Sequence, residues 1–321
     1  MIHNKVFIIR LAIVLSIAGM FFSCENNSSH DIIKDGFLNP PDSARPGVYW
    51  YFMDGNLDRA AMTADLESMK KAGIGYVLFL EVNVGLPRGK IDFLSEEWRE
   101  LYKHAVREAE RLGIRVILGS GPGWAGSGGP WVTPAQSMVH LVASDTTVTG
   151  PAEFNAILQL PRPMKPFFGE ESLTQTLKLQ RDSWYEDVVV LAFPAPEISK
   201  RIPNIDEKAL YYRAPYTSQP GVLPYISSSA FFKETLGAAV DKTRIIDLTD
   251  RLQNNGSLSW EIPEGKWIIM RFGKRNNGAV TRPAPAPGLG FECDKFDTNS
   301  FNAHYNAYVG KLIKKDRKSV V

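Results

Sequence analysis

Short runs of hydrophobic residues alternate with helix-like patterns in the segment 37–134. The runs at 48–52, 74–82 and 115–119 are nearly continuous and only a few residues long, which is typical of buried strands. Helical periodicity fills the gaps between them. Strands that alternate with helices predict βα units, and therefore a parallel sheet that is either open or closed into a barrel.

Two helices are expected between these strands. In the first, Met62, Leu66 and Met69 recur at helical spacing, and Gly73 ends the pattern as a C-terminal glycine commonly does. The second begins at Ser95, because a serine hydroxyl caps the free N–H groups of a first turn and two glutamates follow it at once.

The pattern changes after about residue 140. Strand-like segments now follow one another, separated by Pro-, Gly- and Ser-rich stretches and without a long amphipathic helix between them. These segments are 140–149, 156–160, 188–193 and 267–272. We interpret residues 140–287 as an inserted β-rich module that resembles a sandwich.

A strand over 290–296 and a helix over 298–315 then resume the first pattern. The predicted fold class is α/β, namely a partial (β/α)8 TIM-like barrel interrupted by an inserted β-sandwich-like module. The barrel would occupy 37–139 and resume over 288–321.

Residues 1–24 have the features of an export signal. Two basic residues precede an apolar run at 11–22, which is shorter than the about 20 residues that a bilayer span needs. Cys24 follows in a sequence that fits a lipoprotein signal, with a simple signal peptide and an incidental cysteine as the alternative. Residues 25–36 would form a tether. We therefore expect an exported protein that is lipid-anchored in the bacterial outer membrane, on its periplasmic or cell-surface side.

Charge and cysteine content exclude several classes of function. The chain of 321 residues has a formal net charge of +2 and no long basic stripe, so nothing indicates a nucleic-acid partner. Cys293 is the only cysteine besides Cys24, so lipidation of Cys24 would rule out a disulfide within the chain. Cysteine and histidine form no zinc-binding pattern.

Polar residues stand where the predicted barrel strands end. Function in such barrels lies at the carboxyl ends of the strands. Asp54 follows the first strand, Glu81 and Asn83 close the second, and Asp294 and Lys295 end the resumed one. We take all five as candidate substrate-binding residues at one edge of a sheet. Asp54 could instead be a turn residue, and Glu81 could instead form a salt bridge with an arginine or lysine.

A glycine-rich loop follows the third predicted strand. Five glycines between 121 and 129 frame Trp124 and precede Trp131. A phosphate-binding loop is disfavoured, because the Gly-Lys-Ser/Thr ending is missing and prolines remove N–H donors. Two interpretations stay open. Trp124 and Trp131 bind the apolar faces of sugars, or they plug the barrel mouth as structural residues.

These motifs together resemble the opening of glycoside hydrolase family 106. The similarity lies in NPPDSARP at 39–46, YWY at 49–51, DGN at 54–56, PEGKW at 263–267 and, most specifically, the loop at 121–134. It extends over roughly 37–315.

The resemblance implies an inverting, calcium-dependent α-L-rhamnosidase that acts on plant polysaccharides or rhamnosides. Inversion needs two carboxyl groups about 6.5–9.5 Å apart, one acid and one base. The family's catalytic glutamates lie on later barrel strands, one in an Asp-Ser-Tyr-Glu-like segment that is missing from this sequence. The catalytic residues are therefore unknown here and expected beyond Val321. A non-catalytic glycan-binding lipoprotein and a glycosidase with another sugar specificity are the alternatives.

Overall fold

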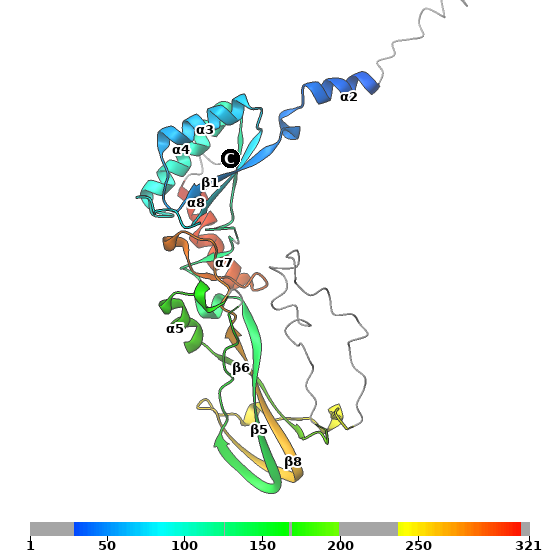
Figure 1. Cartoon of the computed structure of the whole chain (residues 1–321). Helices are drawn as coiled ribbons and strands as arrows, with labels where there is room; N and C mark the ends of the chain where they lie inside the picture. Colours follow the sequence, from blue (N-terminus) through cyan, green and yellow to red (C-terminus); the bar gives the residue numbers. More distant parts are fainter. Residues whose placement is uncertain (1–28, 125, 167–168, 199–236, 316–321) are drawn as a thin grey trace, which may run out of the picture.

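The structure is a computed structural model that describes residues 29–124, 126–166, 169–198 and 237–315. The predicted export signal and the predicted lipidation site, Cys24, lie outside these residues. Figure 1 shows a small sheet covered by helices at one end of the molecule and a β-rich module at the other, with the helices of 298–315 between them. Among the described residues, no helix combines the length and apolar character needed to cross a bilayer.

The first unit is a three-stranded parallel sheet in the order β1-β2-β3. Its strands are β1, Gly47–Met53, β2, Tyr76–Val82, and β3, Arg115–Leu118. The connecting helices are α3, Arg59–Lys71, and α4, Glu96–Leu112. The two predicted βα units and their third strand are thus confirmed.

Local chemistry fixes the ends of both helices. The side chain of Asp58 accepts a hydrogen bond from the backbone of Ala61, and that of Ser95 accepts one from Trp98, so each helix has an N-terminal cap. Gly113 ends α4 with φ at 65°, in the left-handed region that glycine adopts without a Cβ clash. The predicted cap at Ser95 is confirmed.

One face of the parallel sheet is buried and the other is open. Alternate residues of the strands, such as Trp50, Phe52 and Phe79, pack against α3 and α4 in the main core. Leu66 and Trp98 contribute to that core from the helices with no exposed surface. The opposite face presents the exposed side chains of Tyr49, Tyr51 and Ile117.

Helix α2, Ser29–Leu38, occupies most of the segment expected to be a tether. Its side chains Ile32, Ile33 and Phe37 are exposed. The tether is therefore helical over this part.

The β-rich module is a four-stranded antiparallel sheet in the order β5-β8-β6-β7. Its strands are β5, Val139–Ile157, β6, Glu186–Pro194, β7, Ile246–Asp247, and β8, Ser257–Asn276. The predicted strand at 156–160 is only the end of β5. A second sheet that would complete a sandwich is not among the described residues. Helix α5, Gln175–Ser183, was not expected.

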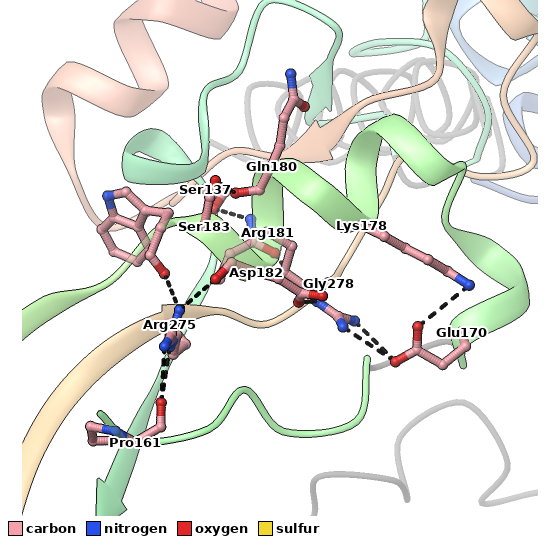
Figure 2. A network of polar contacts seen from close by, with 12 residues as sticks. Ser137, Pro161, Glu170, Lys178, Gln180, Arg181, Asp182, Ser183, Arg275 and Gly278 are labelled. Atoms are coloured by element: carbon pink, nitrogen blue, oxygen red, sulfur yellow. Dashed lines mark hydrogen bonds and ion pairs between the residues drawn. The ribbon is translucent and has the colours of Figure 1, made fainter. Parts of the chain in front are cut away.

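Buried arginines join strand β8 to α5 and its flanking loops (Figure 2). Arg275 donates to the backbone oxygens of Pro161, Asp182 and Trp184. Arg181 pairs with Glu170 and with Asp182. The guanidinium of Arg275 thus satisfies backbone oxygens outside the sheet, and it holds the segments around Pro161 and Trp184 in place without a strand partner.

The C-terminal part departs from the prediction. Strand β9, Phe291–Glu292, pairs antiparallel with β4, Gly128–Gly129, and does not join the parallel sheet. The expectation that the segment 290–296 is a further barrel strand is therefore wrong. The predicted helix over 298–315 is two helices, α7, Thr298–Ala307, and α8, Val309–Lys315, with a non-helical backbone at Tyr308.

Short 3-10 turns also occur in the described ranges. They are Asp42–Ala44, Pro134–Gln136, Glu170–Ser172, Lys242–Arg244, Thr249–Arg251 and Ala286–Gly288.

The buried face of α3 gives a test of this packing. Leu66→Ala removes a side chain with 0% exposure and should lower the free energy of unfolding by about 2–5 kcal/mol. Leu179→Ala, on α5 at 63% exposure, should change it by less than about 0.5 kcal/mol. Urea unfolding followed by circular dichroism measures both, and equal losses would contradict the assignment of the core.

Candidate functional site

Glu81 holds the turn that follows strand β1. One carboxylate oxygen accepts a hydrogen bond from the backbone N–H of Gly55 at 2.9 Å, and the other accepts one from the indole Nε1 of Trp98 at 2.5 Å. Its side chain is 2% exposed. The pKa of Glu81 is raised to about 7, because burial disfavours the charged form more than these hydrogen bonds favour it.

These contacts support a structural role for Glu81. Its side chain points toward helix α4, which covers the buried face of the sheet, and its backbone oxygen accepts from the N–H of Gly123 at 2.9 Å. Glu81 therefore anchors both the turn after β1 and the glycine-rich loop after β3. An indole and one backbone N–H take the place of the salt-bridge partner that the sequence suggested.

Asp54 and Asn83 meet at the same edge. The side-chain amide of Asn83 donates to Oδ2 of Asp54 at 3.1 Å. The other oxygen, Oδ1, is buried and has no hydrogen-bond partner among the described residues. Asp54 adopts φ of 40°, which is uncommon for a residue with a side chain. A buried acceptor without a partner on a strained turn suits a binding group more than a simple turn residue.

An open cavity of about 530 Å³ lies along the uncovered face of the parallel sheet. Trp124 lines it and is 63% exposed. Tyr49 and Tyr51 line it too, with their rings stacked and their centroids 5.4 Å apart. Both tyrosines were missed as site residues, although alternation along β1 already places them on the face opposite Trp50 and Phe52.

Trp131 occupies a different position from Trp124. Its indole stacks on His304 and Tyr308, and its Nε1 donates to Nδ1 of His304 at 3.1 Å. The other ring nitrogen of His304 lies 2.8 Å from the backbone oxygen of Ser120. Burial lowers the pKa of His304, so the neutral ring accepts from the indole and donates to the carbonyl. The plug interpretation therefore fits Trp131, and the sugar-binding one stays with Trp124.

Asp294 and Lys295 follow β9 and not a strand of the parallel sheet. Oδ1 of Asp294 accepts from the backbone N–H of Phe296, as in a turn, and Lys295 pairs with Glu292 at 2.7 Å. Both side chains have partners within three residues in the sequence. These contacts do not support the prediction that Asp294 and Lys295 lie beside Asp54 with the other strand ends.

The donor set for calcium is incomplete in the described ranges. No group of three or more His, Cys, Asp or Glu side chains there is arranged to hold a metal ion. Calcium prefers six to eight oxygen ligands, and Asp54 with Asn83 supplies far fewer. The described residues therefore do not form a calcium site by themselves.

Comparison with known proteins decides the family. The model of glycoside hydrolase family 106, described as alpha-L-rhamnosidase, matches residues 38–320. The chain belongs to this family. The resemblance drawn from the loop at 121–134 is thereby confirmed.

Two similar proteins show how much of a family member this chain spans. A protein of Formosa agariphila named "Putative beta-glucuronidase" is 32% identical over 283 residues, which is 88% of this chain and 22% of that protein. The structure of a rhamnosidase from Novosphingobium sp. PP1Y superposes with a TM-score of 0.66 at 24% identity, over 88% of this chain and 38% of the other. The family 106 chain therefore spans well under half the length of these proteins and shares the fold of the second.

Substitution should distinguish the structural role of Trp131 from the exposed position of Trp124. Trp131→Ala removes stacking on two rings and leaves Nδ1 of His304 without its donor, so it should lower the free energy of unfolding by about 3 kcal/mol. Trp124→Ala removes an exposed ring and should cost less than about 1 kcal/mol. Urea unfolding of both variants checks the assignment, which fails if Trp124→Ala is the more damaging change.

The raised pKa of Glu81 predicts a pH dependence of stability. Because its folded-state value, about 7, lies above the ordinary 4.5, stability is fully present below about pH 4.5 and is lost as the pH rises through about 7. The loss should reach about 3 kcal/mol. Glu81→Gln cannot titrate and should lack this decrease, whereas Glu153→Gln, at an exposed position of β5, should retain it. Urea unfolding at several pH values measures the three curves, and an unchanged slope in Glu81→Gln would refute the assignment.

Proposed function

We propose that this chain is the sugar-binding opening part of an inverting α-L-rhamnosidase, with the cavity beside Trp124 as part of its substrate cleft. The observation that carries the proposal is the exposed indole of Trp124, which is held by a loop hydrogen-bonded to strand β2 and borders a cavity of about 530 Å³. Ligand pockets are commonly about 300–1,000 Å³. An indole suits the apolar face of a 6-deoxy sugar.

The parallel sheet would form the first part of a TIM-like barrel. Its uncovered face, which carries Tyr49, Tyr51 and Leu78, would then point to the barrel interior. In that arrangement Asp54 and Asn83 stand at the carboxyl end of the strands, where barrel enzymes bind substrates. We infer that Oδ1 of Asp54 accepts a hydrogen bond from a sugar hydroxyl.

The acid and the base would come from parts of the longer relatives that this chain does not span. Inversion needs one protonated carboxyl group and one carboxylate about 6.5–9.5 Å apart across the scissile bond. Glu81 is engaged with Trp98 and Gly55, and Asp294 is engaged in a turn, which leaves Asp54 for binding. Calcium would require further oxygen ligands from those same parts. Lipid anchoring at Cys24, and with it location at the outer membrane, is part of this proposal and rests on the sequence alone.

A glycosidase with another sugar specificity is the second candidate. The relative from Formosa agariphila has a name that specifies a different sugar, a glucuronide. Assaying aryl α-L-rhamnoside and aryl β-glucuronide side by side discriminates the two.

Residues 25–321 expressed alone should not hydrolyse an aryl α-L-rhamnoside. A longer protein, in which this chain is extended to the length of its relatives, should hydrolyse it. In the longer protein, Trp124→Ala should lower kcat/KM by about tenfold or more through lost sugar contact. Release of the aryl alcohol with added calcium measures both. Turnover by residues 25–321 that Glu81→Gln abolishes would show that the catalytic pair lies in this chain.

A further inference from the structure

A second cavity, of about 470 Å³, lies in the β-rich module, apart from the cleft beside Trp124. Its polar and aromatic lining comes from the end of β5, the start of β6, the turn before β8 and β8 itself. The lining residues with polar or aromatic side chains are Gln159, Tyr185, Asp187, Asn254, Asn255 and Arg271. None of them takes part in the site proposed above.

The ring of Tyr185 packs against Gly273 of strand β8. Any Cβ at Gly273 would come within 2.3 Å of this ring, so only glycine leaves room for it there. Arg271 and Arg275, the neighbours of Gly273 on the same face of the strand, lie 5.4 and 4.9 Å from the ring centroid. Arg275 is itself held by the backbone oxygens described above (Figure 2). Tyr185 is thus a fixed aromatic platform at the wall of the cavity.

The carboxylate of Asp187 is fixed beside this platform. Nε and one terminal nitrogen of Arg271 donate to its two oxygens, each at 2.7 Å, and the hydroxyl of Tyr185 donates to Oδ1 at 2.6 Å. The side chain of Arg271 is 5% exposed, whereas that of Asp187 is 36% exposed. The carboxylate therefore still faces solvent, and Arg271 positions it.

Charge decides between classes of ligand. The remaining donor group of Arg271 is used by the backbone oxygen of Leu158 at 3.0 Å, so the guanidinium has little left to offer an anion. Asp187 and Arg271 cancel each other's charge. The other polar lining groups named above are the neutral amides of Gln159, Asn254 and Asn255. The amide oxygen of Asn255 already accepts from the backbone N–H and the hydroxyl of Ser257, so this side chain offers a ligand its NH2 group.

From this arrangement we propose that the cavity is an auxiliary binding site for a neutral oligosaccharide. A sugar ring stacks on Tyr185, Asp187 accepts from its hydroxyl groups, and the amides of the 254–255 turn bind further hydroxyls. The site would hold the polysaccharide on which the proposed glycosidase acts, so the ligand class rests on the proposed function.

The test is calorimetric titration of the full chain with a neutral α-L-rhamnose tetrasaccharide. We expect two binding events. Asn254→Ala and Tyr185→Leu should weaken the affinity of the same binding event by about tenfold or abolish that event. Trp124→Ala should remove only the other event. Asn155→Ala, a surface amide on β5, is the matched control and should leave both unchanged.

Tyr185→Leu alters packing on Gly273, so thermal unfolding accompanies each titration. Asn254 is exposed in a turn, and its variant keeps the test valid if Tyr185→Leu does not fold. Two events that persist in Asn254→Ala and in folded Tyr185→Leu would overturn the proposal, as would a single event in the unsubstituted chain that only Trp124→Ala removes. Preferential binding of tetragalacturonate would overturn the neutral class. A single event in the unsubstituted chain that Tyr185→Leu and Asn254→Ala weaken and Trp124→Ala leaves intact would count against the proposed cleft and not against the auxiliary site.

Discussion

The arrangement of the candidate cleft depends on the hydrogen bonds of one buried residue, Glu81. Glu81 binds the backbone of Gly55 and the indole of Trp98 with its side chain, and the backbone of Gly123 with its carbonyl. It thereby joins the turn after β1, the helix α4 and the loop after β3. Burying a carboxyl group is unfavourable unless it is hydrogen-bonded, and here its two partners belong to the turn after β1 and to helix α4. The backbone bond between Glu81 and Gly123 fixes the residue that precedes Trp124.

Elements with strong local signals could be predicted from the sequence. The strands of the parallel sheet and the cap at Ser95 are set by residues within a few positions of one another, and the structure has them all. The site residues were harder to assign. Sequence position placed Glu81 at a strand end but could not tell which face its side chain takes, because that depends on Trp98 in the packed helix.

The failures have a common cause. A strand over 290–296 was expected to extend the barrel, but its backbone partner is Gly128–Gly129, and that pairing is fixed by tertiary contacts. Likewise, Trp124 and Trp131 look equivalent in the glycine-rich loop. The distant ring of His304 distinguishes the partly buried indole of Trp131 from the exposed one of Trp124.

That histidine carries a consequence for the order of folding. It lies 173 residues beyond Trp131 and 184 beyond Ser120, and it bonds to both. Closing so long a stretch of chain is entropically unfavourable and slow compared with forming a βα unit. The parallel sheet and its helices can therefore assemble early from neighbouring segments, whereas Ser120 and Trp131 gain their bonds to His304 only when α7 arrives. A nascent chain on the ribosome would have its scaffold long before the glycine-rich loop had all its contacts.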